Sequence, residues 1–380
     1  MQIRRPFWLS RIELGWKHAP IVWLSGVRRV GKTTLAKSIE NAAYINCDLP
    51  RNREQLEQIE FFFENLKEPI VIFDEIHQLE NPSEVLKIGA DEFSEKRILA
   101  TGSSTLAATS KFRDSLAGRK RVVHLMPIIS TELGIFKRPQ LKDRLLRGGM
   151  PQRLINQTKD SEFYSEWLDS FYARDIQELF KVFKRHEFLK LSEILIRQNG
   201  GLAEITSLAK HSSLTRPTVN SYLNILEASH VIKILRPFHD GGRREILSQP
   251  KIYAFDTGFV AYYRGWDNLR PTDCGPLFEN LVLDLLRAHF PEQPLQFWKN
   301  KQNREIDFVL SRGRGICDAI ECKWTLQTRN ALNFKAFRDQ YPQGKNYIVT
   351  AEKIPTRKEM MNKLTIVLCH INDLPSLIAQ

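Results

Sequence analysis

The sequence predicts an α/β protein in three parts, because the pattern of apolar residues changes twice along its 380 residues. In residues 1–140, short apolar runs alternate with helical stretches, which is typical of a parallel sheet covered by helices on both faces. Residues 141–265 have mainly helical periodicity, and residues 266–380 return to strands mixed with helices. At roughly 100–200 residues for each domain, we expect one domain for each part.

Composition excludes a disordered chain and favours a polyanionic partner. Hydrophobic residues make up 42% of the sequence and charged residues 26%, as in ordinary globular proteins. The 56 lysines and arginines exceed the 44 acidic residues, so the formal net charge is +12. Nucleic acid or an anionic membrane surface would suit this excess of positive charge. The alternative is a generally basic soluble protein.

The sequence shows no sign of a membrane or secreted protein. No apolar run approaches the ~18 residues that span a bilayer. Arg11, Glu13 and Lys17 interrupt the N-terminal segment where a signal peptide would be apolar. The five cysteines are scattered and lack the paired spacing of a zinc site. We therefore expect a cytoplasmic protein in a reducing environment, with no membrane contact and no structural zinc.

A phosphate-binding loop occupies residues 26–33, GVRRVGKT, which fits the pattern G-x-x-x-x-G-K-[ST] in full. It lies between the apolar run 21–24 and a predicted helix over residues 33–40, which is the setting that this loop requires. Its backbone N–H groups should surround phosphates, Lys32 should reach the β- and γ-phosphates, and the Thr33 hydroxyl should bind Mg²⁺. ATP and Mg²⁺ are the expected cofactors. The expected nucleotide-binding residues are Gly26, Arg28, Arg29, Gly31, Lys32, Thr33, Thr34 and Asp74.

Two carboxylates follow the apolar run 70–73. We expect Asp74 to support the Mg²⁺ ion and Glu75 to act as the base that orients the attacking water. A carboxylate pair here could also be a helix cap, but the phosphate-binding loop upstream favours the catalytic role. A further apolar run, 98–100, precedes hydroxyl residues that would lie beside Asp74. Ser103 or Ser104 would sense the γ-phosphate there, and the sequence does not separate the two.

Four stretches in order resemble the bacterial and archaeal AAA+ ATPases of the AAA_14 type: SGVRRVGKTT, IVIFDEIHQL, ILATGSSTLA and LAGRKRVVHLMPIISTEL. The later GGMPQ, YARDI and KIYAFDTGF resemble the C-terminal part of these proteins, a domain of unknown function named DUF4143. The resemblance covers nearly the whole chain. It implies an ATP-hydrolysing homo-oligomer, such as a ring of about six subunits.

The same resemblance gives Arg119, in the stretch LAGR, a role in hydrolysis. This arginine would complete the site of a neighbouring subunit or sense the nucleotide of its own chain. The alternative is a solvated basic turn, since Lys120 and Arg121 follow directly and Arg113 lies close by in the sequence.

The middle part predicts a winged helix. Helical stretches cover residues 189–197 and 205–209, and Thr215 caps a third helix that carries Pro217 in its first turn. A strand over residues 231–235 then leads into a turn that forms a basic wing.

If this unit binds DNA, Arg216, Thr218 and Asn220 face the groove, and Arg243 and Arg244 of the wing bind phosphates. The alternative is a lid or packing unit that transmits the nucleotide state.

Three acids and a lysine stand in order in the C-terminal part: Glu279 on a predicted helix, Asp307 on a strand, and Glu321 and Lys323 on the next strand. This order resembles the PD-(D/E)XK nucleases. It implies that Glu279, Asp307 and Glu321 bind a divalent metal and that Lys323 stabilises the attacking water or the phosphate charge. The alternatives are ordinary surface ion pairs, or a nuclease-like fold that binds without cleaving.

Together these features predict a P-loop AAA+ domain with a parallel sheet, a helical and winged-helix middle, and an α/β nuclease-like C-terminal domain. The expected function is ATP hydrolysis coupled to the binding and remodelling or processing of DNA. The alternative is a nucleotide-controlled signalling or assembly switch whose winged helix and C-terminal domain bind protein.

Overall fold

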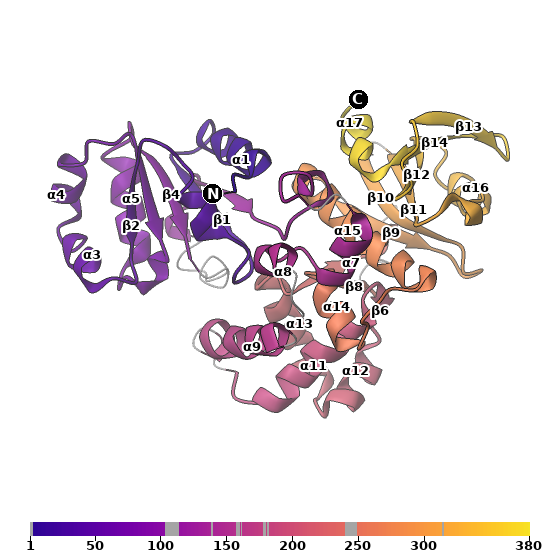
Figure 1. Ribbon diagram of the computed structural model, residues 1–380, viewed down its shortest axis with the longest axis horizontal. Helices are drawn as coiled ribbons and strands as arrows, with labels where there is room; N and C mark the ends of the chain where they lie inside the picture. Colours follow the sequence, from indigo (N-terminus) through magenta and orange to yellow (C-terminus); the bar gives the residue numbers. More distant parts are fainter. Residues whose placement is uncertain are drawn as a thin grey trace.

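The computed structural model describes residues 3–102, 114–137, 140–156, 160, 162–177, 180, 182–239, 249–313 and 315–380 (Figure 1). Five of the residues named above therefore lie outside the described part of the chain: Ser103, Ser104, Arg113, Arg243 and Arg244. Within these ranges, no helix combines the length and apolar character needed to cross a bilayer.

The N-terminal part is built on a parallel sheet of five strands in the order β2-β3-β4-β1-β5. The strands are β1 (Ile21–Ser25), β2 (Ala42–Asn46), β3 (Ile70–Asp74), β4 (Arg97–Thr101) and β5 (Lys120–His124). The three strands predicted from apolar runs, β1, β3 and β4, are confirmed. β2 and β5 lie at the edges of the sheet, where partial exposure replaces the continuous apolar run with mixed residues.

Helices cover both faces of this sheet (Figure 1). Val22 and Leu24 of β1 pack in one core with Trp8 of α1, whereas Ile21 and Trp23 point to the other face. The helices are α1 (Pro6–Trp16), α2 (Lys32–Ala36), α3 (Pro50–Gln55), α4 (Ile59–Glu64) and α5 (Pro82–Asp91).

The helix predicted over residues 33–40 is shorter than expected, since α2 ends at Ala36. The Ser38 hydroxyl donates to the Leu35 carbonyl at 2.6 Å, and such a local bond competes with continuation of a helix.

The middle part is helical with a small antiparallel sheet in the order β6-β8-β7. Its first helices are α7 (Leu141–Arg147), α8 (Pro151–Ile155), α9 (Glu162–Phe171) and a π-helix over Tyr172–Gln177. A second group follows: α11 (Arg185–Gln198), β6 (Gly201–Leu202), α12 (Ile205–Ser212), α13 (Arg216–Ala228), β7 (Ile232–Leu235) and β8 (Lys251–Ala254). As predicted, Thr215 caps α13 by accepting from the Thr218 N–H.

The C-terminal part contains a mixed sheet of six strands in the order β13-β14-β12-β11-β10-β9. Its strands are β9 (Leu295–Lys299), β10 (Glu305–Gly313), β11 (Ile316–Lys323), β12 (Asn346–Thr350), β13 (Arg357–Met361) and β14 (Leu364–His370). The antiparallel pair β10 and β11 has Phe308 opposite Ile320. α14 (Thr257–Tyr263) ends the middle part. The helices of the C-terminal part are α15 (Pro271–His289), α16 (Leu332–Arg338) and α17 (Leu374–Ala379), and α15 packs on β11.

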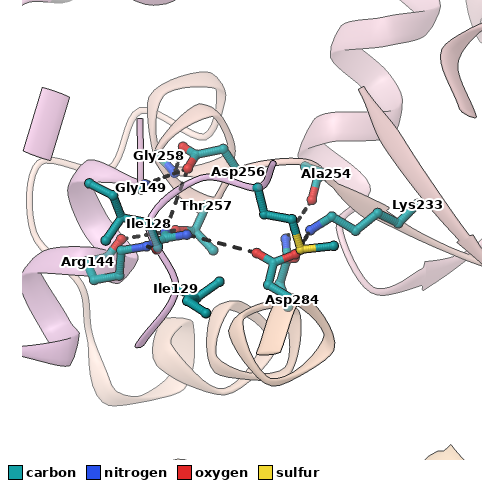
Figure 2. A network of polar contacts seen from close by, with 12 residues as sticks. Ile128, Ile129, Arg144, Gly149, Lys233, Ala254, Asp256, Thr257, Gly258 and Asp284 are labelled. Carbon is teal, nitrogen blue, oxygen red and sulfur yellow. Dashed lines mark hydrogen bonds and ion pairs between the residues drawn. The ribbon is translucent and has the colours of Figure 1, made fainter. Parts of the chain in front are cut away.

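A buried polar network joins the three parts (Figure 2). At its centre Arg144 of α7 donates to the Ile128 carbonyl at 2.6 Å and to the Thr257 hydroxyl at 2.9 Å. The same guanidinium lies 3.7 Å from a carboxylate oxygen of Asp256 and 3.9 Å from one of Asp284 in α15. Arg144 is 0% exposed, so this network is a core of charges between the parts.

Candidate nucleotide site

Two glycines shape the backbone of the phosphate-binding loop between β1 and α2. Gly26 has a φ of +145°, and a Cβ there would lie 2.5 Å from the Leu125 carbonyl oxygen. Gly31, with a φ of +102°, precedes α2 directly, and a Cβ there would lie 3.7 Å from Pro151. Glycine is therefore required at these positions by conformation, and at Gly26 also by space.

Lys32 lies within the curve of this loop. Its ammonium donates to the carbonyl oxygens of Gly26 at 2.9 Å and Val27 at 3.3 Å. Burial lowers the pKa of Lys32, while the negative charges of Glu75 and Asp175 oppose this change. The ammonium is thus held among acceptors in a place where phosphate oxygens could replace the carbonyls.

Asp74 ends β3 in a fixed orientation and is 2% exposed. The Tyr44 hydroxyl donates to one of its carboxylate oxygens and the Thr101 hydroxyl to the other. Burial and the bond to Asp74 raise the pKa of Tyr44, which keeps its hydroxyl protonated as a donor. Each Asp74 oxygen keeps a lone pair for a further ligand, as a residue beside Mg²⁺ requires.

Glu75 turns away from the strand axis because its φ is +55°, in the left-handed region. The Thr101 hydroxyl accepts from the Glu75 N–H at 3.1 Å and so fixes this turn. The Glu75 carboxylate lies 3.3 Å from His77 and is partly exposed. The conformation is of the strained kind found at functional sites.

The phosphate-binding loop and Glu75, the residue after β3, open into one cleft of about 690 Å³, whereas Asp74 lies buried behind its wall. The middle part supplies its other wall, with Gln152, Phe171, Arg174 and Asp175 among the lining residues. Seven residues of the loop and the start of α2 were predicted to bind nucleotide, and all seven line the cleft together with Glu75: Gly26, Arg28, Arg29, Gly31, Lys32, Thr33 and Thr34. Arg174 and Asp175 belong to the YARDI stretch, where no local pattern indicated a contact with the loop.

Direct contacts hold the middle part against the loop. The Trp167 indole N–H donates to the Arg28 carbonyl at 2.9 Å, and the Arg28 guanidinium lies 3.6 Å from the Asp175 carboxylate. Arg29 lies over the Phe163 ring, 5.8 Å from its centre. The segment from α9 to the π-helix therefore forms one side of the cleft, and we call this segment the lid.

Two histidines support the loop from behind. His230 lies two residues after the end of α13, and its ring lies 3.1 Å from the hydroxyl of Ser25, the residue before Gly26. The rings of His124 and His230 lie 3.8 Å apart. Burial lowers the pKa of His230 to about 4 and the pKa of His124 well below its usual value. Both rings are therefore neutral at pH 7.

Acidification should weaken this support. Between about pH 6.5 and 4 the unfolded chain binds a proton at His230 that the folded chain does not, so the free energy of unfolding falls as the pH falls. We expect a loss of roughly 2–3 kcal/mol from this group across that window. Urea unfolding of wild type and His230→Gln at several pH values measures it, and the variant should show the shallower decline. Parallel profiles for the two proteins would contradict this assignment.

Arg119 lies at the end of the strands that is opposite to the cleft. It directly precedes β5, at the amino end of the strands, and its guanidinium donates twice to Asp91, at 2.6 and 3.0 Å. The structure therefore does not bring Arg119 to the phosphate-binding loop of its own chain. A role in a neighbouring subunit stays a prediction.

The predicted DNA-facing residues of the middle part lie at the start of α13. Arg216 and Asn220 are exposed. Arg216 donates to the Thr206 hydroxyl of α12 at 2.6 Å, and the hydroxyls of Thr215 and Thr218 lie 2.8 Å apart. Thr218 is thus used partly in the helix cap, whereas Asn220 faces solvent.

The C-terminal acids do come together, but lysines accompany them. Lys251 of β8 lies 3.0 Å from Glu279 and also pairs with Glu305, while Lys323 lies 3.0 Å from Glu321. The sequence pattern did not indicate Lys251, because it lies on a strand of the middle part.

Burial raises the pKa of Glu279 and of Glu321 to about 7 and also raises the pKa of Asp307, which accepts from the Cys322 N–H at 2.7 Å. In the described part of the chain, no three histidine, cysteine or acidic side chains form a group suited to a metal ion. Metal binding by Glu279, Asp307 and Glu321 therefore stays a prediction.

The loop between β1 and α2 and the parallel sheet have the arrangement of a P-loop fold, and family models match this part of the chain and both parts that follow it. The model AAA_14, an AAA domain, matches residues 18–134, and DUF4143, a domain of unknown function, matches residues 274–369. The two models match in the order that the sequence motifs indicated. A third model, the domain of unknown function DUF8612, matches residues 138–270 between them.

The relatives and the similar solved structures share little sequence identity with this chain. Two uncharacterized proteins, Rv2008c of Mycobacterium tuberculosis and Mb2031c of Mycobacterium bovis, are each 28% identical over 324 residues, which cover 82% of this chain and 72% of theirs. The RuvB Holliday junction branch migration motor of Thermotoga maritima is 16% identical, with 60% of this chain and 89% of that one covered and a TM-score of 0.30. Cdc6p of Pyrobaculum aerophilum is 13% identical, with 68% and 91% covered and a TM-score of 0.28. Similarity at this level says nothing about what this chain does.

Proposed function

We propose that this protein is a Mg²⁺-dependent ATP hydrolase that acts on DNA. The observation that carries the proposal is the single cleft in which the phosphate-binding loop, Glu75 and the lid meet. The loop offers backbone N–H groups and an ammonium to phosphates, and Glu75 offers a partly exposed carboxylate beside them.

Each of these residues has its own role in hydrolysis. Lys32 binds the β- and γ-phosphates, and Thr33 and Asp74 hold the Mg²⁺ ion. The ion, when bound, neutralises charge on the phosphate oxygens. Glu75 accepts the proton of the attacking water, and Arg174 of the lid adds positive charge to the cleft.

Action on DNA is proposed for the unit from α11 to β8, which has the element order of a winged helix. Three helices precede two antiparallel strands, and Arg216 and Asn220 stand exposed on the third helix. Arg216 donates to the uncharged Thr206 hydroxyl, and its charge helps to lower the pKa of Glu204, so a DNA phosphate or base would compete with these two neighbours for the guanidinium.

The DNA-binding surface is tested by alanine substitution on α13. Arg216→Ala and Asn220→Ala should each weaken binding to a short duplex, about 10-fold for the arginine, because one phosphate or base contact is lost. Fluorescence anisotropy over a range of salt concentrations measures this loss and the salt slope. Lys190→Ala, an exposed change on α11, is the matched control. Equal binding by all four proteins would remove α13 from the interface.

We also propose a homo-oligomer in which Arg119 serves the site of a neighbour. Supplied across an interface, an arginine is worth ~10³-fold or more in hydrolysis rate. Arg119→Ala should therefore be nearly inactive as a pure protein. Mixing it with Lys32→Ala subunits should restore part of the activity, because some interfaces then combine an intact loop with an intact arginine. Full activity of Arg119→Ala alone, or no recovery on mixing, would contradict this role.

A further inference from the structure

A groove runs along the open edge of the N-terminal sheet. β5 is the outermost strand there, and Val122 at its centre is 57% exposed. Two cavities of about 800 and 400 Å³ lie along this edge. They adjoin each other, because both are lined by His124, Met126, Arg287, Phe290, Pro291 and Gln293. We call them together the edge groove; α1 and β5 form one wall, and the C-terminal end of α15 with the residues after it forms the other.

The wider part of the edge groove is positively charged. Four basic side chains line it, against one described carboxylate, that of Glu292: Arg11, Lys120, Arg121 and Arg287. Arg121 is exposed. The guanidinium of Arg287 donates to the Ile234 carbonyl at 3.2 Å, which fixes its position in the wall. Charges spaced along a groove suit an extended polyanion.

Uncharged rings lie beside these charges. His289 and Phe290 at the end of α15 are partly exposed and line the groove. Phe7 packs against the His289 ring at 4.6 Å and holds it in place. Burial, aided by the charge of Arg11, lowers the pKa of His289, so this ring is neutral at pH 7. Flat rings next to basic side chains are what the bases of a single strand require for stacking.

We propose that the edge groove binds a single strand of nucleic acid, with phosphates on the basic side chains and bases against the rings at the end of α15. An acidic peptide would satisfy the charges but would have no use for the rings, so the nucleic acid is favoured. This inference builds on the proposed action on DNA, but it uses a surface separate from Arg216 and Asn220 at the start of α13; of the described residues of that helix, only Glu227 at its other end lines the smaller, inner cavity.

The edge groove also reaches the nucleotide site. Its inner cavity is lined by Val27 of the phosphate-binding loop and by the pair His124 and His230. His230 in turn contacts Ser25, the residue before the loop. A strand bound in the groove therefore lies against the rear of the loop, and its binding should change the rate of ATP hydrolysis.

The experiment compares two charge-reversed variants of the full chain with wild type. Lys120→Glu/Arg121→Glu changes the groove, and Arg51→Glu/Lys67→Glu makes the same change of net charge on exposed residues near α3 and α4, across the sheet (Figure 1). The probe is a fluorescent oligothymidylate of about 20 nucleotides, long enough for one groove. The groove variant should bind it about 10-fold more weakly and with a salt slope smaller by about 1.4, which corresponds to two phosphate contacts.

The outcomes separate this inference from the proposed function. An equal loss in both double variants would show a general charge effect and overturn the inference. Binding of poly-glutamate in place of the oligonucleotide, lost in the groove variant, would make the groove a peptide site and also overturn it. Wild type that binds duplex DNA through α13 but no single strand would refute the groove alone, whereas no binding of any DNA would refute the proposed action on DNA. Arg121→Ala, with its thermal midpoint measured, repeats the test with less risk to folding.

Discussion

Lys32→Ala is expected to abolish both ATP binding and hydrolysis, whereas Glu75→Gln is expected to bind ATP and hydrolyse it about 10²–10⁴-fold more slowly. The first change removes the ammonium that the loop carbonyls of Gly26 and Val27 hold in place. The second keeps the size of the side chain and removes only its capacity to accept a proton. The two variants thus separate binding from chemistry.

Nucleotide affinity and turnover have to be measured on the same preparations. A fluorescent ATP analogue gives the affinity, and phosphate release in Mg²⁺ gives the rate. Lys67→Ala and Glu80→Gln are matched controls, because both residues are exposed and lie outside the cleft. Wild-type turnover in Glu75→Gln would remove the base role from Glu75, and undiminished ATP binding by Lys32→Ala would remove the loop from the site.

The nucleotide site was largely predictable because its signals are local. Between a buried strand and a helix, a Gly-x-x-x-x-Gly-Lys-Thr loop is specific for phosphate binding. β3 is recognisable as an apolar run that is followed by Asp74 and Glu75. Thr101, which binds both residues, was not singled out, although the sequence placed the polar end of its strand beside Asp74.

Contacts between distant parts could not be predicted in this way. Arg174 and Asp175 reach the cleft more than a hundred residues after the loop, and nothing in the YARDI stretch reports this. The C-terminal acids show the same limit. Their order on α15, β10 and β11 was predicted, but Lys251 arrives from another sheet and changes the charge of the cluster. The net charge of a buried site depends on which helices and strands pack around it. Local patterns in a single sequence do not show which distant elements will be neighbours.

The buried network around Arg144 gives the largest expected effect on stability. Arg144→Met removes the cation that faces the carboxylates of Asp256 and Asp284, both of which are 0–1% exposed. Breaking a buried pair by removing one partner costs roughly 3–5 kcal/mol, because the other charge is left uncompensated. Burial already raises the pKa of Asp256 despite Arg144 and the N–H groups of Gly149 and Gly258, so without the arginine this carboxylate is costly.

The loss of stability caused by Arg144→Met should depend on whether Asp256 is charged. Asp256→Asn in the Arg144→Met background removes the uncompensated charge, so the two changes together should cost less than the sum of the single changes, by about 1 kcal/mol or more. Thermal and urea midpoints of the three variants measure this coupling. Strict additivity would show that the carboxylate and the guanidinium do not interact, in spite of the 3.7 Å between them.

A steric change tests the same network without altering any charge. A Cβ on Gly148 would lie 1.9 Å from an Asp256 carboxylate oxygen, and Gly148 has a φ of +79°. Gly118 has a nearly equal φ of +76° with nothing within 4 Å of such a Cβ, so Gly118→Ala measures the cost of a positive φ without a clash, about 1 kcal/mol. Gly148 adds to the clash a ψ of −177°, which at positive φ is essentially a glycine-only conformation. Gly148→Ala should lower the midpoint clearly further, and it should also weaken ATP binding, because Gly149 leads from this network into α8, whose Pro151 and Gln152 line the cleft. Equal effects of the two alanines would mean that the carboxylate moves freely, and the network would then not hold the three parts in register.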